Sequence, residues 1–169
     1  MRRNVLAVLS AILLVGMLAG PAAAKAPKPT PPPDSSDTYP AGLVFPFEVR
    51  LDGWSNEKVK VIVDRQGTER MVVTGSARTL VTNTESGDSL SVRTHGRVEI
   101  WDPGDGTSRL KARGHTLFFF FPGDQNPAGE GNGLFLVHGQ ASQTLDLGTD
   151  VVTGFEFLGG YRELCAELD

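Results

Sequence analysis

Residues 45–63 read FPFEVRLDGWSNEKVKVIV, and apolar residues occupy every second position at both ends of this stretch. A period of two places alternate side chains on opposite faces of a β-strand, so one face of each segment is predicted to be buried. The apolar positions are Phe45, Phe47, Val49 and Leu51 in the first segment and Val59, Val61 and Val63 in the second. Two strands with one buried face are therefore expected.

The same alternation continues further along the chain, at Leu90, Val92 and Thr94 and again at Leu110 and Ala112. Turn-forming residues separate these runs, at 64–67 (DRQG), 85–88 (ESGD) and 102–106 (DPGDG). Asp, Gly and Pro tolerate the backbone angles that tight turns require. The pattern predicts an all-β fold, an antiparallel barrel or sandwich of about eight to ten short strands. A short helix is expected only at the C-terminal end, over 161–168, with Leu164, Cys165 and Leu168 on one face.

The run Leu117–Phe121 is apolar at every position, which predicts a strand buried on both faces. The next segment, 123–133 (GDQNPAGEGNG), has almost no apolar content and is expected to be a mobile loop. Two binding regions are considered. The first is an interior cavity for a small apolar ligand, lined by Phe118, Phe120, Leu134 and Leu136. If the core is filled instead, the contact surface would comprise Trp54, Trp101 and the 123–133 loop.

The N-terminus has the three parts of a secretory signal peptide: basic residues at 2–3, an apolar run over 5–19 and small residues at 22–24. We expect cleavage after Ala24 on the general secretory route, and an extracellular mature protein that has no membrane segment. Residues 25–40 carry six prolines and are predicted to be a disordered linker that stays outside the sheet. Residues 41–169 then form a single β domain.

The charge balance bears on the partner. Removal of residues 1–24 takes away Arg2 and Arg3 and no acidic residue, so the net charge changes from −4 to −6. The mature chain contains no run of basic residues, and phosphate-backbone binding needs clustered Lys and Arg. The expected partners are a small apolar ligand or an extracellular or cell-wall component, and nucleic acid is not expected.

No catalytic motif is present. A G-x-S-x-G sequence is missing, and the three histidines, His95, His115 and His138, match no metal-ligand spacing. Each histidine sits beside a glycine, which suits the end of a strand. We therefore predict no metal and no cofactor, and a secreted, non-catalytic binding domain. The alternatives are a small secreted hydrolase or cyclase with its site at a barrel mouth, and a structural module of the cell wall.

Cys165 is the sole cysteine, although secreted domains usually contain cysteines in pairs. The chain is expected to be a monomer, with a Cys165-linked dimer as the alternative.

Three segments carry a resemblance: 45–49 (FPFEV), 113–117 (RGHTL) and 163–168 (ELCAEL). Together they resemble a group of small secreted bacterial β-rich proteins of unknown function, which begin with a cysteine before a Phe-Pro strand. That cysteine would fall near Leu43 or Val44, where this chain has an apolar residue. The resemblance implies that Cys165 packs against the start of the first strand without a disulfide. In related chains such a bridge would close a loop of over a hundred residues, worth up to about 4–5 kcal/mol.

Overall fold

The computed structural model describes residues 33–168, so the predicted signal peptide and most of the proline-rich linker lie outside the described residues. The described chain is almost entirely antiparallel β-structure, which confirms the all-β prediction. The elements are β1 (Ser35–Tyr39), β2 (Val49–Ser55), β3 (Lys58–Val63), β4 (Glu69–Asn83), β5 (Ser89–Trp101), β6 (Thr107–Phe120), β7 (Gln125–Asn126), β8 (Gly129–Glu130), β9 (Gly133–Asp146), β10 (Val151–Glu163) and the 3₁₀ turn η1 (Cys165–Glu167).

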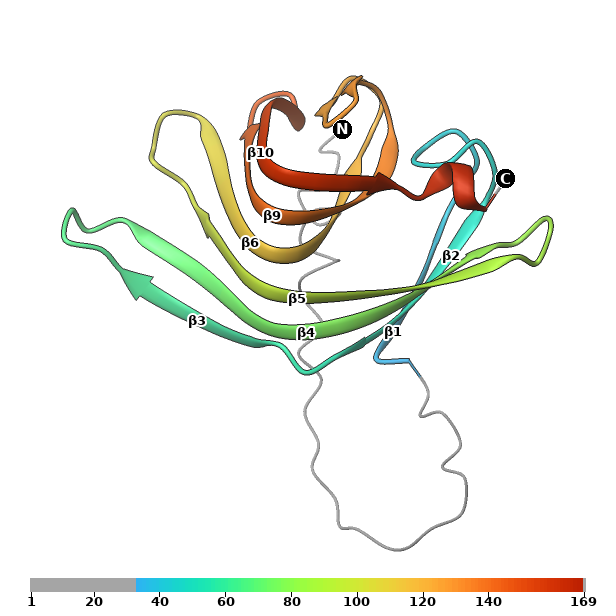
Figure 1. The fold of residues 1–169 in the computed structure, drawn as a ribbon. Coiled ribbons are helices and arrows are strands. Elements are labelled where there is room, and N and C mark those ends of the chain that lie inside the picture. Colours follow the sequence, from blue (N-terminus) through green and yellow to red (C-terminus); the bar gives the residue numbers. More distant parts are fainter. Residues whose placement is uncertain (1–32, 169) are drawn as a thin grey trace, which may run out of the picture.

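Eight strands form one sheet in the order β1-β2-β4-β5-β6-β9-β10, and β3 pairs with residues 69–74 of β4, on the same edge as β2. Within residues 33–168, β10 pairs only with β9, so the sheet does not close into a barrel. The sheet instead folds over, so that β2, β4 and β5 share an apolar cluster with β6 and β9 as in a sandwich (Figure 1). Of the two predicted architectures, the sandwich is therefore the better description.

A row of glycines crosses the middle of the sheet. Five glycines on five adjacent strands are paired in register: Gly75, Gly96, Gly114, Gly139 and Gly159. Gly96 has φ +148° and Gly114 has φ +115°, in the region that L side chains rarely adopt. A Cβ on Gly96 would lie 2.0 Å from the Arg113 carbonyl oxygen. The strands pass through these glycines without ending, and Figure 1 shows β4, β5, β6 and β9 curving at mid-length.

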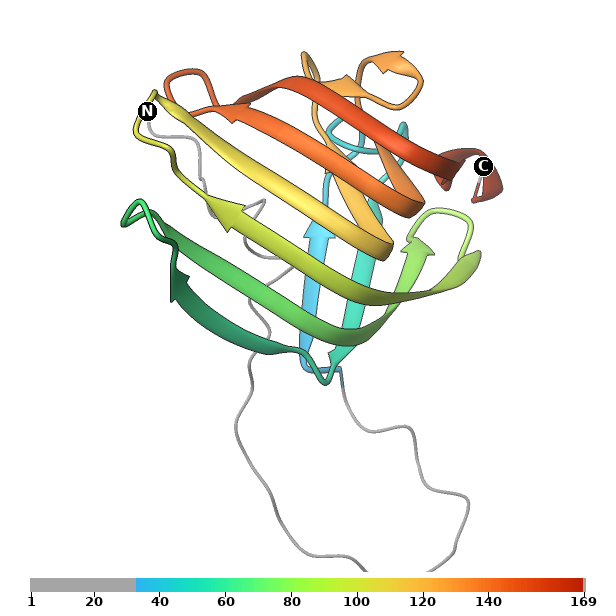
Figure 2. The same cartoon turned by 60° about the vertical axis from the view of Figure 1, so that its left-hand side comes forward.

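The strands β5 and β6 separate at this row. They are paired from His95–His115 to Trp101–Arg109 and not beyond. On the far side of the row, β5 continues beside β4 as far as Ser89. The strand β6 instead continues beside β9 as far as Phe120. The sheet therefore forks into a leaf of β1, β2, β4 and β5 and a leaf of β6, β9 and β10, which can be followed in Figures 1 and 2.

The fork divides the apolar core in two. One cluster fills the space between the leaves and contains Phe45, Val49, Val81, Val92 and Leu134, with Leu117 and Phe119 packed against it. The second cluster lies on the other face of β6 and β9 and contains Leu110, Phe118, Phe120, Phe135 and Val137. Neighbouring residues of the phenylalanine run therefore enter different clusters, which confirms that both faces of this strand are buried.

Three sequence-based predictions are wrong in detail. The linker was expected to stay outside the sheet, but Ser35–Tyr39 forms β1 and pairs with β2, because the prolines lie on either side of these five residues. The valines of β3 were expected to face the core, but Val61 is 64% exposed because β3 is an edge strand with no covering leaf. The predicted C-terminal helix is only η1, and residues 161–163 belong to β10.

The segment 123–133, predicted to be a loop, contains the β7–β8 hairpin and is anchored by the buried Asp124. Asp124 accepts hydrogen bonds from the Phe121 amide at 2.6 Å and the Val152 amide at 2.8 Å. Burial raises the pKa of this carboxyl, and both hydrogen bonds oppose the shift. The hairpin is therefore fixed to the start of β10 at its base.

The single cysteine packs into the cluster between the leaves. The thiol of Cys165 donates a hydrogen bond to the Val44 carbonyl oxygen at 3.6 Å. Leu164 and Leu168, on either side, are fully buried. Burial raises the pKa of the Cys165 thiol to about 12, and the nearby Glu163 carboxylate adds to the shift.

The glycine row can be tested by adding one methyl group. Gly114→Ala is expected to lower the free energy of unfolding by about 2–3 kcal/mol, because its Cβ would lie 2.3 Å from the His95 carbonyl oxygen at a positive φ. Gly154→Ala is the matched control on β10, since its Cβ would lie an ordinary 3.8 Å from Thr144. Urea unfolding of both variants measures the difference, and equal stabilities would contradict the role of the row.

The buried thiol can be tested by alkylation. We expect iodoacetamide to label Cys165 in the native protein at least about a hundredfold more slowly than in the urea-unfolded chain, because only the thiolate reacts. Mass spectrometry of timed samples at mildly alkaline pH gives both rates. Equal rates would show an accessible thiol and would favour the disulfide-linked dimer.

Candidate functional site

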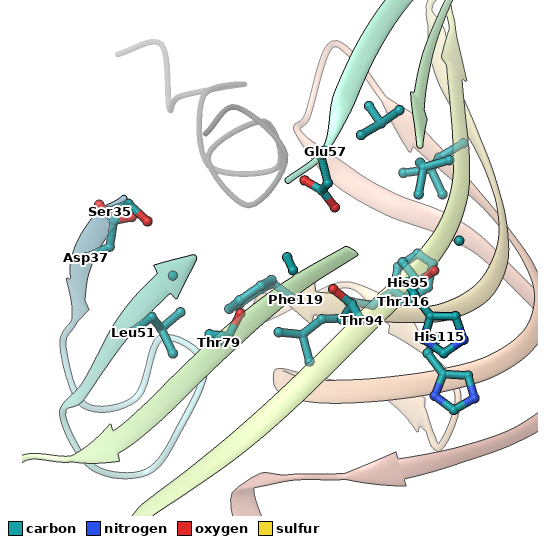
Figure 3. Close-up of a pocket in the computed structure, with 18 of the residues that line it drawn as sticks. Ser35, Asp37, Leu51, Glu57, Thr79, Thr94, His95, His115, Thr116 and Phe119 are labelled. Carbon is teal, nitrogen blue, oxygen red and sulfur yellow. The ribbon is translucent and has the colours of Figure 1, made fainter. Parts of the chain in front are cut away.

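A pocket of about 130 Å³ lies at the fork between β5 and β6 (Figure 3). Its position follows from the topology. The two leaves separate there, and β5 and β6 each lose the other as a neighbouring strand. The lining residues come from β1, β2, the β2–β3 connection, β4, β5, β6 and β9. The apolar part of the lining includes Leu51, Val73, Val98, Leu110, Leu117, Phe118 and Phe119.

Glu57 is one of two acidic residues in the lining, and it points into this space from the β2–β3 connection (Figure 3). Its carboxylate oxygen Oε2 accepts a hydrogen bond from the Ser55 hydroxyl at 3.2 Å, and the Glu57 amide donates to the same hydroxyl at 3.0 Å. Burial raises the pKa of Glu57, and the Ser55 hydrogen bond only partly offsets this shift. A partly desolvated carboxyl without a cation beside it is suited to receive a hydrogen-bond donor from a ligand.

The remaining polar lining is uncharged on the sheet side. Thr79, Thr94 and Thr116 contribute hydroxyl groups from three successive strands, and Gln143 is 6% exposed. Asp37 of β1 is the second acidic residue of the lining, and Figure 3 shows it apart from Glu57. The pocket thus combines a mostly apolar wall with a few separated polar groups, which is typical of small-molecule sites.

The three histidines lie side by side across the sheet, although they are far apart in the sequence. His95 pairs with His115, and His115 pairs with His138. The ring centroids are 4.5 Å apart for the first pair and 6.0 Å apart for the second. All three side chains are exposed, and within residues 33–168 no group of three His, Cys, Asp or Glu side chains is arranged to hold a metal ion.

The histidines do not form a catalytic pair with Glu57. His95 and His115 reach the margin of the pocket, but Figure 3 shows their rings together and away from the Glu57 carboxyl. Among residues 33–168, no serine, cysteine or acidic side chain is hydrogen-bonded to a histidine. A nucleophile and its base within hydrogen-bond reach would be the signature of covalent hydrolysis.

The structure does not bring the four predicted cavity residues together. Phe118 lines the pocket, whereas Phe120 lies fully buried in the same cluster away from it. Leu134 and Leu136 of β9 lie on the other side of the leaf from Phe118 and Phe120, in the cluster between the leaves. These four residues belong to the core on two sides of one leaf.

The two predicted surface tryptophans share one face of the sheet, and both are half-buried. Trp54 lies beside Arg78, whose guanidinium carbon is 5.0 Å from the ring centroid. The guanidinium carbon of Arg70 is 4.7 Å from the Trp101 ring centroid, and the Lys111 ammonium nitrogen is 5.8 Å from the same centroid. The 123–133 hairpin, the third part of the predicted contact surface, is anchored instead beside the start of β10.

Glu57 was missed in the sequence analysis. It follows Asn56 in a polar turn, where a carboxylate is unremarkable, and only the fork brings this turn over the sheet. The three threonines were also missed, because their common pocket depends on the pairing of β4 with β5 and on the separation of β6. No local pattern in the sequence carries that information.

The raised pKa of Glu57 predicts a pH-dependent penalty on folding. Below the ordinary carboxyl pKa, Glu57 is protonated in both the folded and the unfolded state. Its burial then does not lower the free energy of unfolding. As the pH rises, the unfolded chain ionises first, so the wild type loses stability relative to Glu57→Gln until the folded pKa has been passed. Urea unfolding of both proteins at pH values below and above this window measures the change. A stability difference that stays constant with pH would contradict the burial of this carboxyl.

No helical segment within residues 33–168 has the length and hydropathy needed to cross a bilayer. Comparison of the chain with protein-family models, curated proteins and solved structures found no match.

Proposed function

We propose that this chain is an exported, non-catalytic binding domain whose ligand is a small, largely apolar molecule held in the pocket at the fork. The observation that supports the proposal is the pocket itself, in which core side chains of both leaves and one desolvated carboxyl surround a space of about 130 Å³. Export is inferred from the signal-peptide pattern of residues 1–24.

The size of the space limits the ligand. An engineered apolar protein cavity of about 150 Å³ holds one benzene molecule. The fork pocket is close to this volume, so a ligand of about one ring fits within its walls. Phe118 and Phe119 both reach the lining, and their rings offer the edge and face contacts that aromatic ligands favour.

The polar groups define the second property of the ligand. Glu57 has one protein hydrogen-bond donor, Ser55, which leaves its carboxylate able to accept another. A hydroxyl or amine on the ligand would supply that donor and would stabilise the charged form of Glu57. The three threonine hydroxyls lie along the same space and can orient such a group. A ring that carries one hydroxyl or amine is therefore the expected chemistry.

The proposal is tested by filling the pocket. Phenol and benzylamine are titrated into the isotope-labelled mature protein, and the amide shifts of residues lining the pocket are followed by NMR. We expect Thr79→Phe to abolish the shifts, because Thr79 lines the pocket and a larger side chain would occupy it.

Thr82→Phe is the matched control, since Thr82 lies on the same strand with its side chain on the other face. It should leave binding unchanged. Shifts that persist in Thr79→Phe, or a wild type that binds neither compound, would refute the proposed site.

A further inference from the structure

The basic residues of the central strands all lie on the face opposite the pocket. In an antiparallel pair, directly opposed residues share a face. The register pairs Arg78 with Arg93, Arg97 with Arg113 and Glu99 with Lys111. We call this surface the basic face, and it contains every arginine and lysine of β4, β5 and β6: Arg70, Arg78, Arg93, Arg97, Arg109, Lys111 and Arg113.

The charge on this face is only partly neutralised. Arg70, Arg97 and Arg109 have ion pairs with Asp64, Glu99 and Asp105, at 2.7–2.9 Å. For Arg78, Arg93, Lys111 and Arg113, no carboxylate of residues 33–168 forms an ion pair. Glu99 is the single acidic residue of these three strands on the face.

Two of the cross-strand pairs place like charges directly opposite each other. Arg78 faces Arg93, and Arg97 faces Arg113, with the exposed row of histidines running between these two pairs. Such juxtapositions destabilise a sheet, and within residues 33–168 only Arg97 of these four arginines has a counter-charge, Glu99 at 2.9 Å. An anion bound between the arginines would reverse the repulsion, so the face is electrostatically suited to a ligand that carries several negative groups.

A shallow depression of about 610 Å³ lies at one end of the basic face, beside Arg78, Arg93 and His95. Within it, the Arg78 guanidinium stacks on Trp54, and its Nε donates to the Ser91 hydroxyl at 3.0 Å. These contacts hold the guanidinium plane and leave its terminal N–H groups for a carboxylate or sulfate. Hydroxyl and amide side chains of Ser55, Asn56 and Ser76 line the same depression. The Asp34 carboxylate also lines it and accepts a hydrogen bond from the Ser55 amide at 2.7 Å.

We propose that the basic face binds an acidic polysaccharide, at a site whose depression borders the pocket at the fork and shares Ala77, Thr94 and His95 with it. Carboxylate or sulfate groups of the glycan would contact Arg78, Arg93 and Arg113. Sugar hydroxyls would hydrogen-bond to the serine and asparagine side chains of the depression. Single-stranded nucleic acid fits less well, because arginines already cover Trp54 and Trp101, and the face then lacks free aromatic surfaces on which bases could stack.

The test compares two double variants with the same change in net charge. Arg93→Gln/Arg113→Gln removes two unpaired charges from the basic face. Arg65→Gln/Arg162→Gln removes one charge from the β3–β4 turn and one that is paired with Glu167. Binding to heparin, polygalacturonate, neutral dextran and a single-stranded oligonucleotide is measured by calorimetry over a range of salt concentrations.

We expect the wild type to bind heparin or polygalacturonate and not dextran. The face variant should bind at least about tenfold more weakly, with a shallower salt dependence, while the control variant binds like the wild type. Thermal unfolding should show no loss of stability in the face variant, since a repulsion has been removed. Equal weakening of both variants, tighter binding of the oligonucleotide, or no binding to either acidic glycan would overturn the proposal.

Discussion

The architecture depends on the close approach of neighbouring backbones along the glycine row. At Gly96, Gly114 and Gly139, a Cβ would lie 2.0–2.3 Å from a carbonyl oxygen of the next strand, a separation that no side chain permits. The positive φ angles at these positions bend the strands, while the ladders β4–β5, β6–β9 and β9–β10 continue through the row. Strands of 13–15 residues can therefore cross the whole molecule and still enclose a core.

The fork and the pocket follow from this bend. When β6 turns away from β5 at His115, one of its faces comes to lie over β4 and β5 and forms the cluster between the leaves. The opposite face of β6 carries Phe118 and Phe120 into the second cluster. The pocket lies where the two leaves separate, so its lining mixes residues of both. Glu57 enters because the β2–β3 connection crosses the same opening.

The period of two along β5 and the first half of β6 separates apolar from charged surfaces. On β5, Val92, Val98 and Ile100 enter the core, while Arg93, Arg97 and Glu99 face solvent. The same alternation holds on β6, where Leu110 and Ala112 are buried between exposed basic residues. Because the register aligns these strands, one face gathers positive charge even though the chain as a whole is acidic.

Local patterns in the sequence predicted much of this fold. The buried positions Phe45, Phe47, Val49 and Leu51 are those that the alternation indicates, although β2 begins only at Val49. The burial of both faces at Leu117–Phe121 also follows from composition alone. These features depend on residues that are neighbours in the sequence, and the periodicity of the sequence is sufficient to predict them.

Long-range register decides the features that were missed. Gly75 and Gly159 lie 84 positions apart in the sequence, and only the pairing of five strands joins them in one row. The same holds for the histidine row and for the basic face, since Arg78, Arg93 and Arg113 form no run in the sequence. The sequence shows where the glycines and arginines are, but it does not show which of them are neighbours in the sheet.

The most direct measurement of the central claim is a set of cross-strand nuclear Overhauser effects between β5 and β6 in the labelled protein. Contacts between backbone protons should connect residues 95–101 with residues 109–115 and should stop at the His95–His115 pair. Beyond it, β5 should show contacts only to β4, and β6 only to β9. Contacts that continue from Thr94 and Val92 to Thr116 and Phe118 would mean an unforked sheet, and the pocket would then not exist.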